Sequence, residues 1–283
     1  MGGQATFSGK VACPFLFPSR HALVGFVCYA ISRLLRLNLN RITGGFMRRV
    51  VFAEEQIYHI YNRGTDKREV FLNDHDRYRF LGDLREMNNS RPVLNFGYSF
   101  DRNYPQRVDL TKFIFLRPIG IDDKPLVDIL AFVLMPNHYH LLLTQRVQGG
   151  VAAFMHKLGT AYTMYFNKKY QRTGVLFQGR FKAVMIVNDG HFDGIPYYIH
   201  ANPLKLTAPL PSIEAQINFL EAYKWSSFRD YAGMHNFPSV IKMDLMAEFF
   251  RRDGGVLAGM AKWLKNRKST PVEPVPPIEA QPQ

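Results

Sequence analysis

The chain has 283 residues, of which 47% are hydrophobic, enough for one large domain or two small ones with a proper core. Its formal net charge of +13 indicates a polyanionic partner such as nucleic acid, although a merely basic soluble surface is the alternative. The two cysteines, Cys13 and Cys28, lie near the N-terminus. Because the rest of the chain has no cysteine, it can form neither a disulfide framework nor a cysteine-based metal site, and we expect a reducing, cytoplasmic setting.

The two ends differ in composition from the middle of the chain. Residues 1–53 contain seven Lys or Arg and no Asp or Glu, and the apolar run at 22–32 is too short to cross a membrane. We expect 1–46 to be an extension outside the fold, with Met47 as the true start. The Pro-rich segment 268–283 predicts a disordered tail.

The core segments follow one another as strands and helices. We expect strands at 56–64, at 126–145 with a break at Met-Pro-Asn, and at 173–187, and a hairpin inserted within 91–125. We expect helices at 74–90 with an Asp cap, at 150–170, and at 189–203 ending at Pro203. This order predicts an α+β fold of ferredoxin-like (RRM-like) type, an antiparallel sheet with helices on one face. We place this domain at 47–235 and a C-terminal helical appendage at 236–267.

The stretch LMPNHYHLLL at 134–143 places two histidines in an apolar run. In a strand, positions i and i+2 point to the same face, so His138 and His140 project together. Two adjacent imidazoles suit a divalent cation. The alternative is one buried, hydrogen-bonded histidine beside an exposed one.

The expected helix at 189–203 carries a second set of polar side chains. Tyr198 and Asn202 are four residues apart, which places them on one helical face. A phenol can attack a phosphodiester when a metal polarises the phosphate, and an amide oxygen can be a third ligand beside two histidines. Tyr197 is as good a core residue as it is a nucleophile, and the same holds for Tyr162 and Tyr165.

Four blocks resemble the REP-associated tyrosine transposases, which belong to the single-tyrosine HUH group, named for His-hydrophobic-His. The blocks are MPNHYHLLL, RTGVLFQGRFKA, YIHANPLK and YKWSSFRDYAG, preceded by YHIYNRGTDKREVF. The resemblance runs from about Tyr58 to Tyr231. It implies a ferredoxin-like nuclease domain that cuts single-stranded or hairpin DNA and becomes joined to its 5′-phosphate through a tyrosine.

The resemblance also implies roles for individual residues. It gives His138, His140 and Asn202 as ligands of Mg²⁺ or Mn²⁺, and Tyr198 as the nucleophile. Gly194 and Pro196 depart from an uninterrupted helix, so the helix either begins near Pro196 or is kinked there. Related transposases work as dimers, while REP-associated members resemble monomers, so we favour a monomer.

Basic residues surround these segments, with Phe177 and Phe181 between them. Charge interleaved with aromatics is typical of a groove for single-stranded DNA, although the aromatics are equally suited to the core. The DNA-contacting residues that we expect are Arg63, Lys168, Lys169, Arg172, Arg180, Lys182 and Lys205.

Two other functions compete with that of a DNA nicking and joining enzyme. One is a DNA- or RNA-binding protein of the same fold with a decayed site, which the presence of all four chemical residues disfavours. The other is a zinc hydrolase, which needs further ligands at hydrolase spacing, whereas the remaining histidines are scattered. His200 lies about 200° around the helix from Tyr198.

Overall fold

The computed structural model describes residues 52–91, 124–186 and 189–267, which all fall within one compact unit, Arg49–Gln283. The expected extension 1–46, most of the hairpin expected within 91–125 and the tail 268–283 lie outside the described residues. Within that part of the chain, no helix combines the length and apolar character needed to cross a membrane.

Four antiparallel strands form the central sheet in the order β2-β3-β1-β4. The strands are β1 (Ile57–Arg63), β2 (Val127–Met135), β3 (His138–Gln145) and β4 (Lys182–Met185). The Met-Pro-Asn break predicted from the sequence is the β2–β3 turn. Strand β4 is much shorter than the strand expected at 173–187, because residues 171–181 form an irregular connection.

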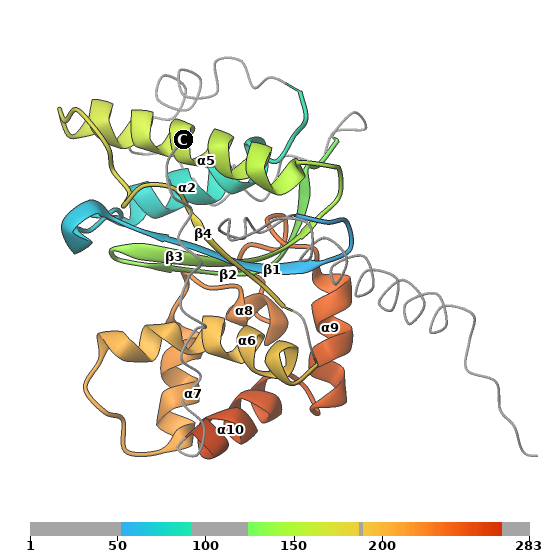
Figure 1. Ribbon diagram of the computed structural model, residues 1–283. Coiled ribbons are helices and arrows are strands. Elements are labelled where there is room, and N and C mark those ends of the chain that lie inside the picture. The colour runs from blue at the N-terminus through green and yellow to red at the C-terminus, as the bar shows by residue number, and fades with distance from the viewer. Residues whose placement is uncertain (1–51, 92–123, 187–188, 268–283) are drawn as a thin grey trace, which may run out of the picture. The chain divides into compact units, whose positions relative to one another are not determined.

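Two helices cover one face of the sheet, α2 (Asp74–Glu86) and α5 (Gly150–Lys169) (Figure 1). With the four strands they complete the β-α-β-β-α-β order of the predicted ferredoxin-like α+β fold, which is thereby confirmed. Helix α5 places Phe154, Leu158 and Tyr162 at intervals of four residues on its buried face. The cap of α2 is Asn73 rather than the Asp expected, and it forms a capping box with Asp76.

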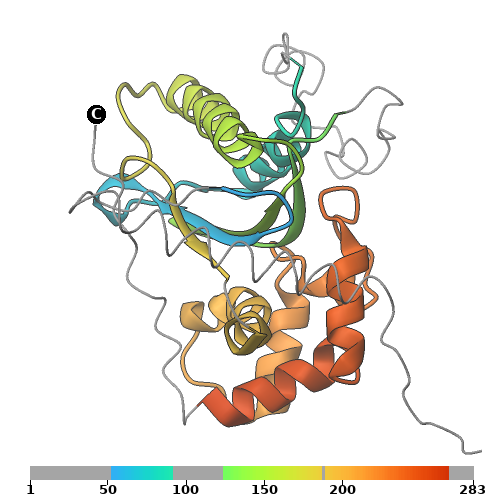
Figure 2. The same ribbon diagram turned by 45° about the vertical axis from the view of Figure 1, so that its right-hand side comes forward.

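The helices that follow β4 lie on the side of the second face of the sheet (Figures 1 and 2). They are α6 (Asp189–Ala201), the 3₁₀ helix η2 (Asn202–Leu206), α7 (Ile213–Ala222), α8 (Phe228–Tyr231), α9 (Met243–Arg252) and α10 (Val256–Asn266). Helices α6 and α9 lie next to the strands, and α7 and α10 lie farther away. The sequence pattern predicted helices on one face and an appendage after it. The structure instead packs α6 together with that C-terminal part, in a second apolar core that includes Val133, Leu142 and Ile199.

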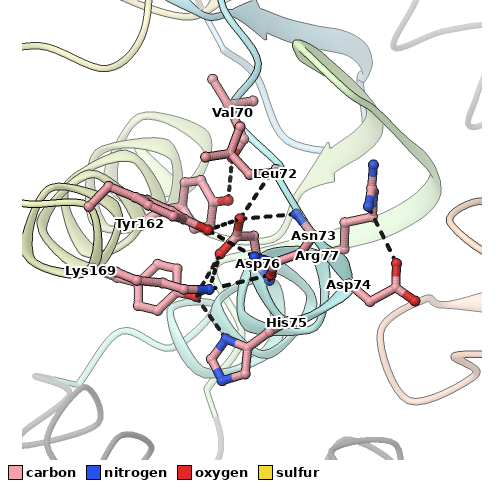
Figure 3. A network of polar contacts seen from close by, with 11 residues as sticks. Val70, Leu72, Asn73, Asp74, His75, Asp76, Arg77, Tyr162 and Lys169 are labelled. Atoms are coloured by element: carbon pink, nitrogen blue, oxygen red, sulfur yellow. Dashed lines mark hydrogen bonds and ion pairs between the residues drawn. The ribbon is translucent and has the colours of Figure 1, made fainter. Parts of the chain in front are cut away.

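A buried carboxylate joins α2 to the C-terminal end of α5 (Figure 3). Asp76 accepts hydrogen bonds from Lys169 Nζ at 2.6 Å, Tyr170 Oη at 2.7 Å and Tyr165 Oη at 2.8 Å. Burial alone would raise the pKa of Asp76, but these hydrogen bonds outweigh it and the pKa is lowered. The network holds α2 and α5 together on the face of the sheet opposite to α6.

Candidate active site

The two histidines of β3 lie on the face covered by α6. Their cross-strand partners in β1 are Arg63 for His138 and Tyr61 for His140, so all four side chains share that face. The intervening Tyr139 points into the other core. The shared face of His138 and His140 predicted from the sequence is therefore observed.

His138 has a defined tautomer. Its Nδ1 lies 2.6 Å from Asn137 Oδ1, and Asn137 Nδ2 donates to the carbonyl of Lys67 at 3.1 Å, which orients the amide. Burial, with smaller effects of Arg63 and Lys205, lowers the pKa of His138 to about 4. The ring is thus neutral at physiological pH with its proton on Nδ1, and Nε2 keeps a lone pair.

His140 is more deeply buried and contacts a third histidine. Its Nδ1 lies 2.8 Å from Nε2 of His59 on β1, and the two rings stack with centroids 5.0 Å apart. Burial and then the neighbouring His59 and His138 lower the pKa of His140 well below its usual value. Three imidazoles therefore line this part of the sheet.

Helix α6 places Tyr198 above the histidines. Its ring centroid is 5.9 Å from that of His140 and 6.1 Å from that of His59, in both cases edge to face. Burial raises the pKa of Tyr198, and the positive charge of Arg267 opposes this effect. The phenol therefore keeps its proton at neutral pH.

The adjacent Tyr197 faces away from this site. Its hydroxyl donates to Asp253 Oδ2 at 2.6 Å, and its ring is 2% exposed between Phe249 and Phe250. Gly259 of α10 allows this close approach, since an added Cβ would lie 1.9 Å from the Tyr197 hydroxyl. Tyr197 therefore anchors α6 to the C-terminal helices.

Asn202 begins the 3₁₀ helix directly after α6, which contains both Gly194 and Pro196. Its Nδ2 donates to the carbonyl of Tyr198 at 2.9 Å, and its Oδ1 accepts from Lys205 Nζ at 2.9 Å. The Lys205 ammonium also lies 5.1 Å from the Tyr198 ring centroid. Desolvation of this ammonium and then the charges of Arg267 and Arg63 lower its pKa.

These side chains fit a hard or borderline divalent cation by their chemistry. The lone pair on His138 Nε2 is available, His140 supplies a second imidazole, and Asn202 Oδ1 already accepts a cationic group. Mixed nitrogen and amide-oxygen donors are compatible with Mn²⁺ or Mg²⁺. No cluster of three or more His, Cys, Asp or Glu arranged to hold a metal occurs among the described residues.

The basic residues predicted to contact DNA divide between the two faces of the sheet. Lys182 pairs with Tyr61 across β1 and β4, and together with Arg63 and Lys205 it lies on the site face. Lys168 and Lys169 end α5 on the other face, where Asp76 holds the Lys169 ammonium. Arg172 contacts Asn167 Oδ1 at 3.3 Å, and Arg180 is exposed just before β4.

The two phenylalanines near these basic residues do not form an exposed stacking surface. Phe177 is 7% exposed and packs against Tyr139 and Tyr162 in the core between the sheet and α5. Phe181 is partly buried against the same core. The sequence allowed these two aromatics to line a DNA groove or to pack in the core, and the structure favours the core.

Sequence reasoning missed His59, Tyr61 and Arg267. The alternation of His59, Tyr61 and Arg63 in the first strand was visible, but it did not show which strand lies beside it. Arg267 is the C-cap of α10 and acts on Tyr198 through its charge. Nothing in the sequence near Arg267 indicated that contribution.

A comparison with protein families matches residues 119–202 to the family described as "Transposase IS200 like". The matched segment is less than half of the chain, and it is similar to IS200-like transposases. The match includes His138, His140, Tyr198 and Asn202, and the transposase resemblance predicted from the sequence is confirmed. No curated protein matches the chain.

Among solved structures, the chain is similar to a REP-associated tyrosine transposase bound to a REP hairpin. The TM-score is 0.39 and the identity 14%, over 71% of this chain and 93% of that one. At this level the likeness says nothing about function.

Proposed function

We propose that this chain is an IS200-like transposase, a metal-dependent, single-tyrosine HUH enzyme that nicks and joins single-stranded or hairpin DNA. The observation that carries the proposal is the placement of the Tyr198 ring within 5.9 Å of His140 and 6.1 Å of His59, beside Asn202. A nucleophile, nitrogen donors and an amide oxygen thus converge from three separate segments of the chain.

In the proposed reaction, Tyr198 Oη attacks the scissile phosphorus in line. A phosphorus–oxygen bond to the tyrosine forms, and the bond to the 3′-oxygen breaks. The phenolic proton is released, and the departing 3′-oxygen takes up a proton to become a hydroxyl. Attack of a 3′-hydroxyl on the phosphotyrosine reverses the step, so that joining uses the same site.

The chain's own residues supply several parts of this reaction. His138, His140 and Asn202 would hold Mg²⁺ or Mn²⁺, which polarises a phosphate when bound. Asn202 Nδ2 donates to the backbone carbonyl of Tyr198 at 2.9 Å, which holds this amide beside the helical turn that carries the nucleophile. Arg63, Lys182 and Lys205 supply positive charge for the DNA backbone on the same face.

The test uses a 5′-overhanging hairpin oligonucleotide with Mn²⁺ and compares matched tyrosine variants. Tyr198→Phe removes the nucleophilic oxygen, so it is expected to abolish the covalent adduct while hairpin affinity stays within about twofold. Tyr197→Phe is the control, because it loses the bond to Asp253, about 1–2 kcal/mol of stability, and retains the adduct.

His138→Ala and His140→Ala are also expected to stop cleavage, and chelation of the metal should have the same effect on the wild type. Wild-type protein that binds the hairpin but never forms an adduct would support the binding-only alternative. An adduct of normal yield in Tyr198→Phe would contradict the proposed nucleophile.

A further inference from the structure

We propose that His59 is a positioning residue, which holds His140 in the tautomer whose Nε2 can bind a divalent cation. This inference rests on the metal site of the proposed function. It concerns a residue of β1, outside the segment matched to the transposase family.

The register of β1 and β3 brings His59 next to His140. His59 pairs directly with Leu142 and therefore lies diagonally across from His140 on the same face of the sheet. Its Nε2 comes within 2.8 Å of His140 Nδ1, and the rings are stacked with an interplanar angle of 21°. His59 and His140 are 1% and 6% exposed, so solvent does not replace this contact.

The hydrogen bond has two possible directions with opposite consequences for the metal. If His59 donates, the neutral His140 carries its proton on Nε2, which then cannot bind a cation. If His140 Nδ1 donates to His59 Nε2, the lone pair of His140 is on Nε2. Only the second arrangement agrees with a metal-binding His140.

His138 is also held by a hydrogen-bond partner on its Nδ1. His138 donates its Nδ1 proton to Asn137 Oδ1 at 2.6 Å and keeps its lone pair on Nε2. Ligating histidines in metal sites are commonly fixed by a partner on their other ring nitrogen. Asn137 and His59 therefore play equivalent parts for the two imidazoles, one from the β2–β3 turn and one from β1.

The test compares His59→Phe with His59→Gln in the full chain. Phenylalanine keeps the ring and its packing but cannot accept a hydrogen bond, whereas glutamine places an oxygen near the position of Nε2. Titration calorimetry with Mn²⁺ is expected to show a loss of affinity of about 10- to 100-fold in His59→Phe. His59→Gln should restore most of that affinity.

Val184→Ala serves as the packing control. Val184 pairs with His59 across β1 and β4, and its truncation disturbs the same spot without touching a hydrogen bond. It is expected to lower thermal stability and to leave Mn²⁺ affinity unchanged. Nitrogen-15 spectra of the metal-free wild type should show His140 protonated on Nδ1, and a mixture of tautomers in His59→Phe.

Equal Mn²⁺ affinity in wild type and His59→Phe would overturn the inference, as would a wild-type His140 protonated on Nε2. Either result leaves the proposed function intact if His138→Ala loses the metal. A wild-type chain that binds no Mn²⁺ would overturn the metal site and the role of His59 together.

Discussion

Adjacent residues on α6 have opposite surroundings, and the roles that we propose for them rest on this difference. Tyr197 is locked to Asp253 among the C-terminal helices, while Tyr198 is half-buried beside the histidines. The sequence alone left both tyrosines open as nucleophiles. Which of the two tyrosines faces the histidines depends on the rotation of α6 about its own axis. That rotation is set by packing partners that are far away in the sequence.

Lys205 is predicted to compete with the metal for Asn202. Its ammonium donates to Asn202 Oδ1 at 2.9 Å, the same oxygen that we assign to the cation. Lys205→Met should tighten Mn²⁺ binding about 30-fold, because about 2 kcal/mol of repulsion between the ammonium and a divalent cation about 4 Å away in a high-dielectric setting is removed. Hairpin affinity should fall in the same variant, because the DNA backbone then meets one positive charge fewer.

The control for Lys205→Met is Lys168→Met at the end of α5, which should change neither affinity. Titration calorimetry with Mn²⁺ alone and with the hairpin alone measures the two effects. Weaker Mn²⁺ binding in Lys205→Met would show that Lys205 holds Asn202 in place for the metal rather than competing with it.

At the scale of elements, α8 carries a buried carboxylate that caps the following turn. Asp230 Oδ1 accepts from the backbone N–H groups of Asn236 and Phe237 at 3.0 and 2.8 Å. Its Oδ2 is buried and makes no hydrogen bond with the described residues. Burial raises the pKa of Asp230 to about 6, despite the opposing effect of these backbone bonds.

This raised pKa predicts a pH-dependent difference between wild type and Asp230→Asn. Between about pH 4 and 6 the folded carboxyl holds a proton that the unfolded one has lost, so wild-type stability falls as the pH rises. The loss is about 1.4 kcal/mol per pH unit within that window. Asparagine keeps the acceptor and does not titrate, so its stability relative to wild type should increase and then level off above pH 6.

Urea unfolding of both proteins from pH 4 to 8 measures the difference. Unfolding free energies that differ by a constant amount across this range would mean that Asp230 titrates normally in the folded chain.

The elements themselves were largely predictable, because their patterns are local. The alternation around His138 and His140 predicted a strand with both imidazoles on one face, and the Met-Pro-Asn step predicted the turn before it. Long-range partners were not predictable. Asp76 holds Lys169 on the face opposite to the site, and His59 joins His140 across 81 residues of sequence, and neither pairing leaves a local signal.

At the scale of the whole molecule, the two faces of the sheet have different roles. The face under α2 and α5 is a core closed by the Asp76 network, and the face under α6 holds the candidate site (Figures 1 and 3). The chain has a net charge of +13, and we expect its basic residues to contribute unequally to DNA affinity, according to the face on which they lie. Basic residues on the site face should contribute to binding, and those at the end of α5 should not.

Salt dependence of hairpin affinity separates these groups. Removing one phosphate-binding cation should reduce the slope of log affinity against log salt by about 0.7 for a single strand. Arg63→Gln and Lys182→Gln are each expected to show that reduction, and Lys168→Gln is expected to retain the wild-type slope. A reduction confined to Lys168→Gln would place the DNA on the other face, and a flat wild-type response would contradict an electrostatic groove.

We expect Tyr198 to become covalently joined to the 5′-phosphate of a cleaved strand. The most direct test is to digest the adduct formed with Mn²⁺ and locate the modified residue by fragmentation mass spectrometry. We expect the nucleotide on Tyr198 alone. A nucleotide on Tyr197, or on Tyr61 across the site, would show that Tyr198 is not the nucleophile.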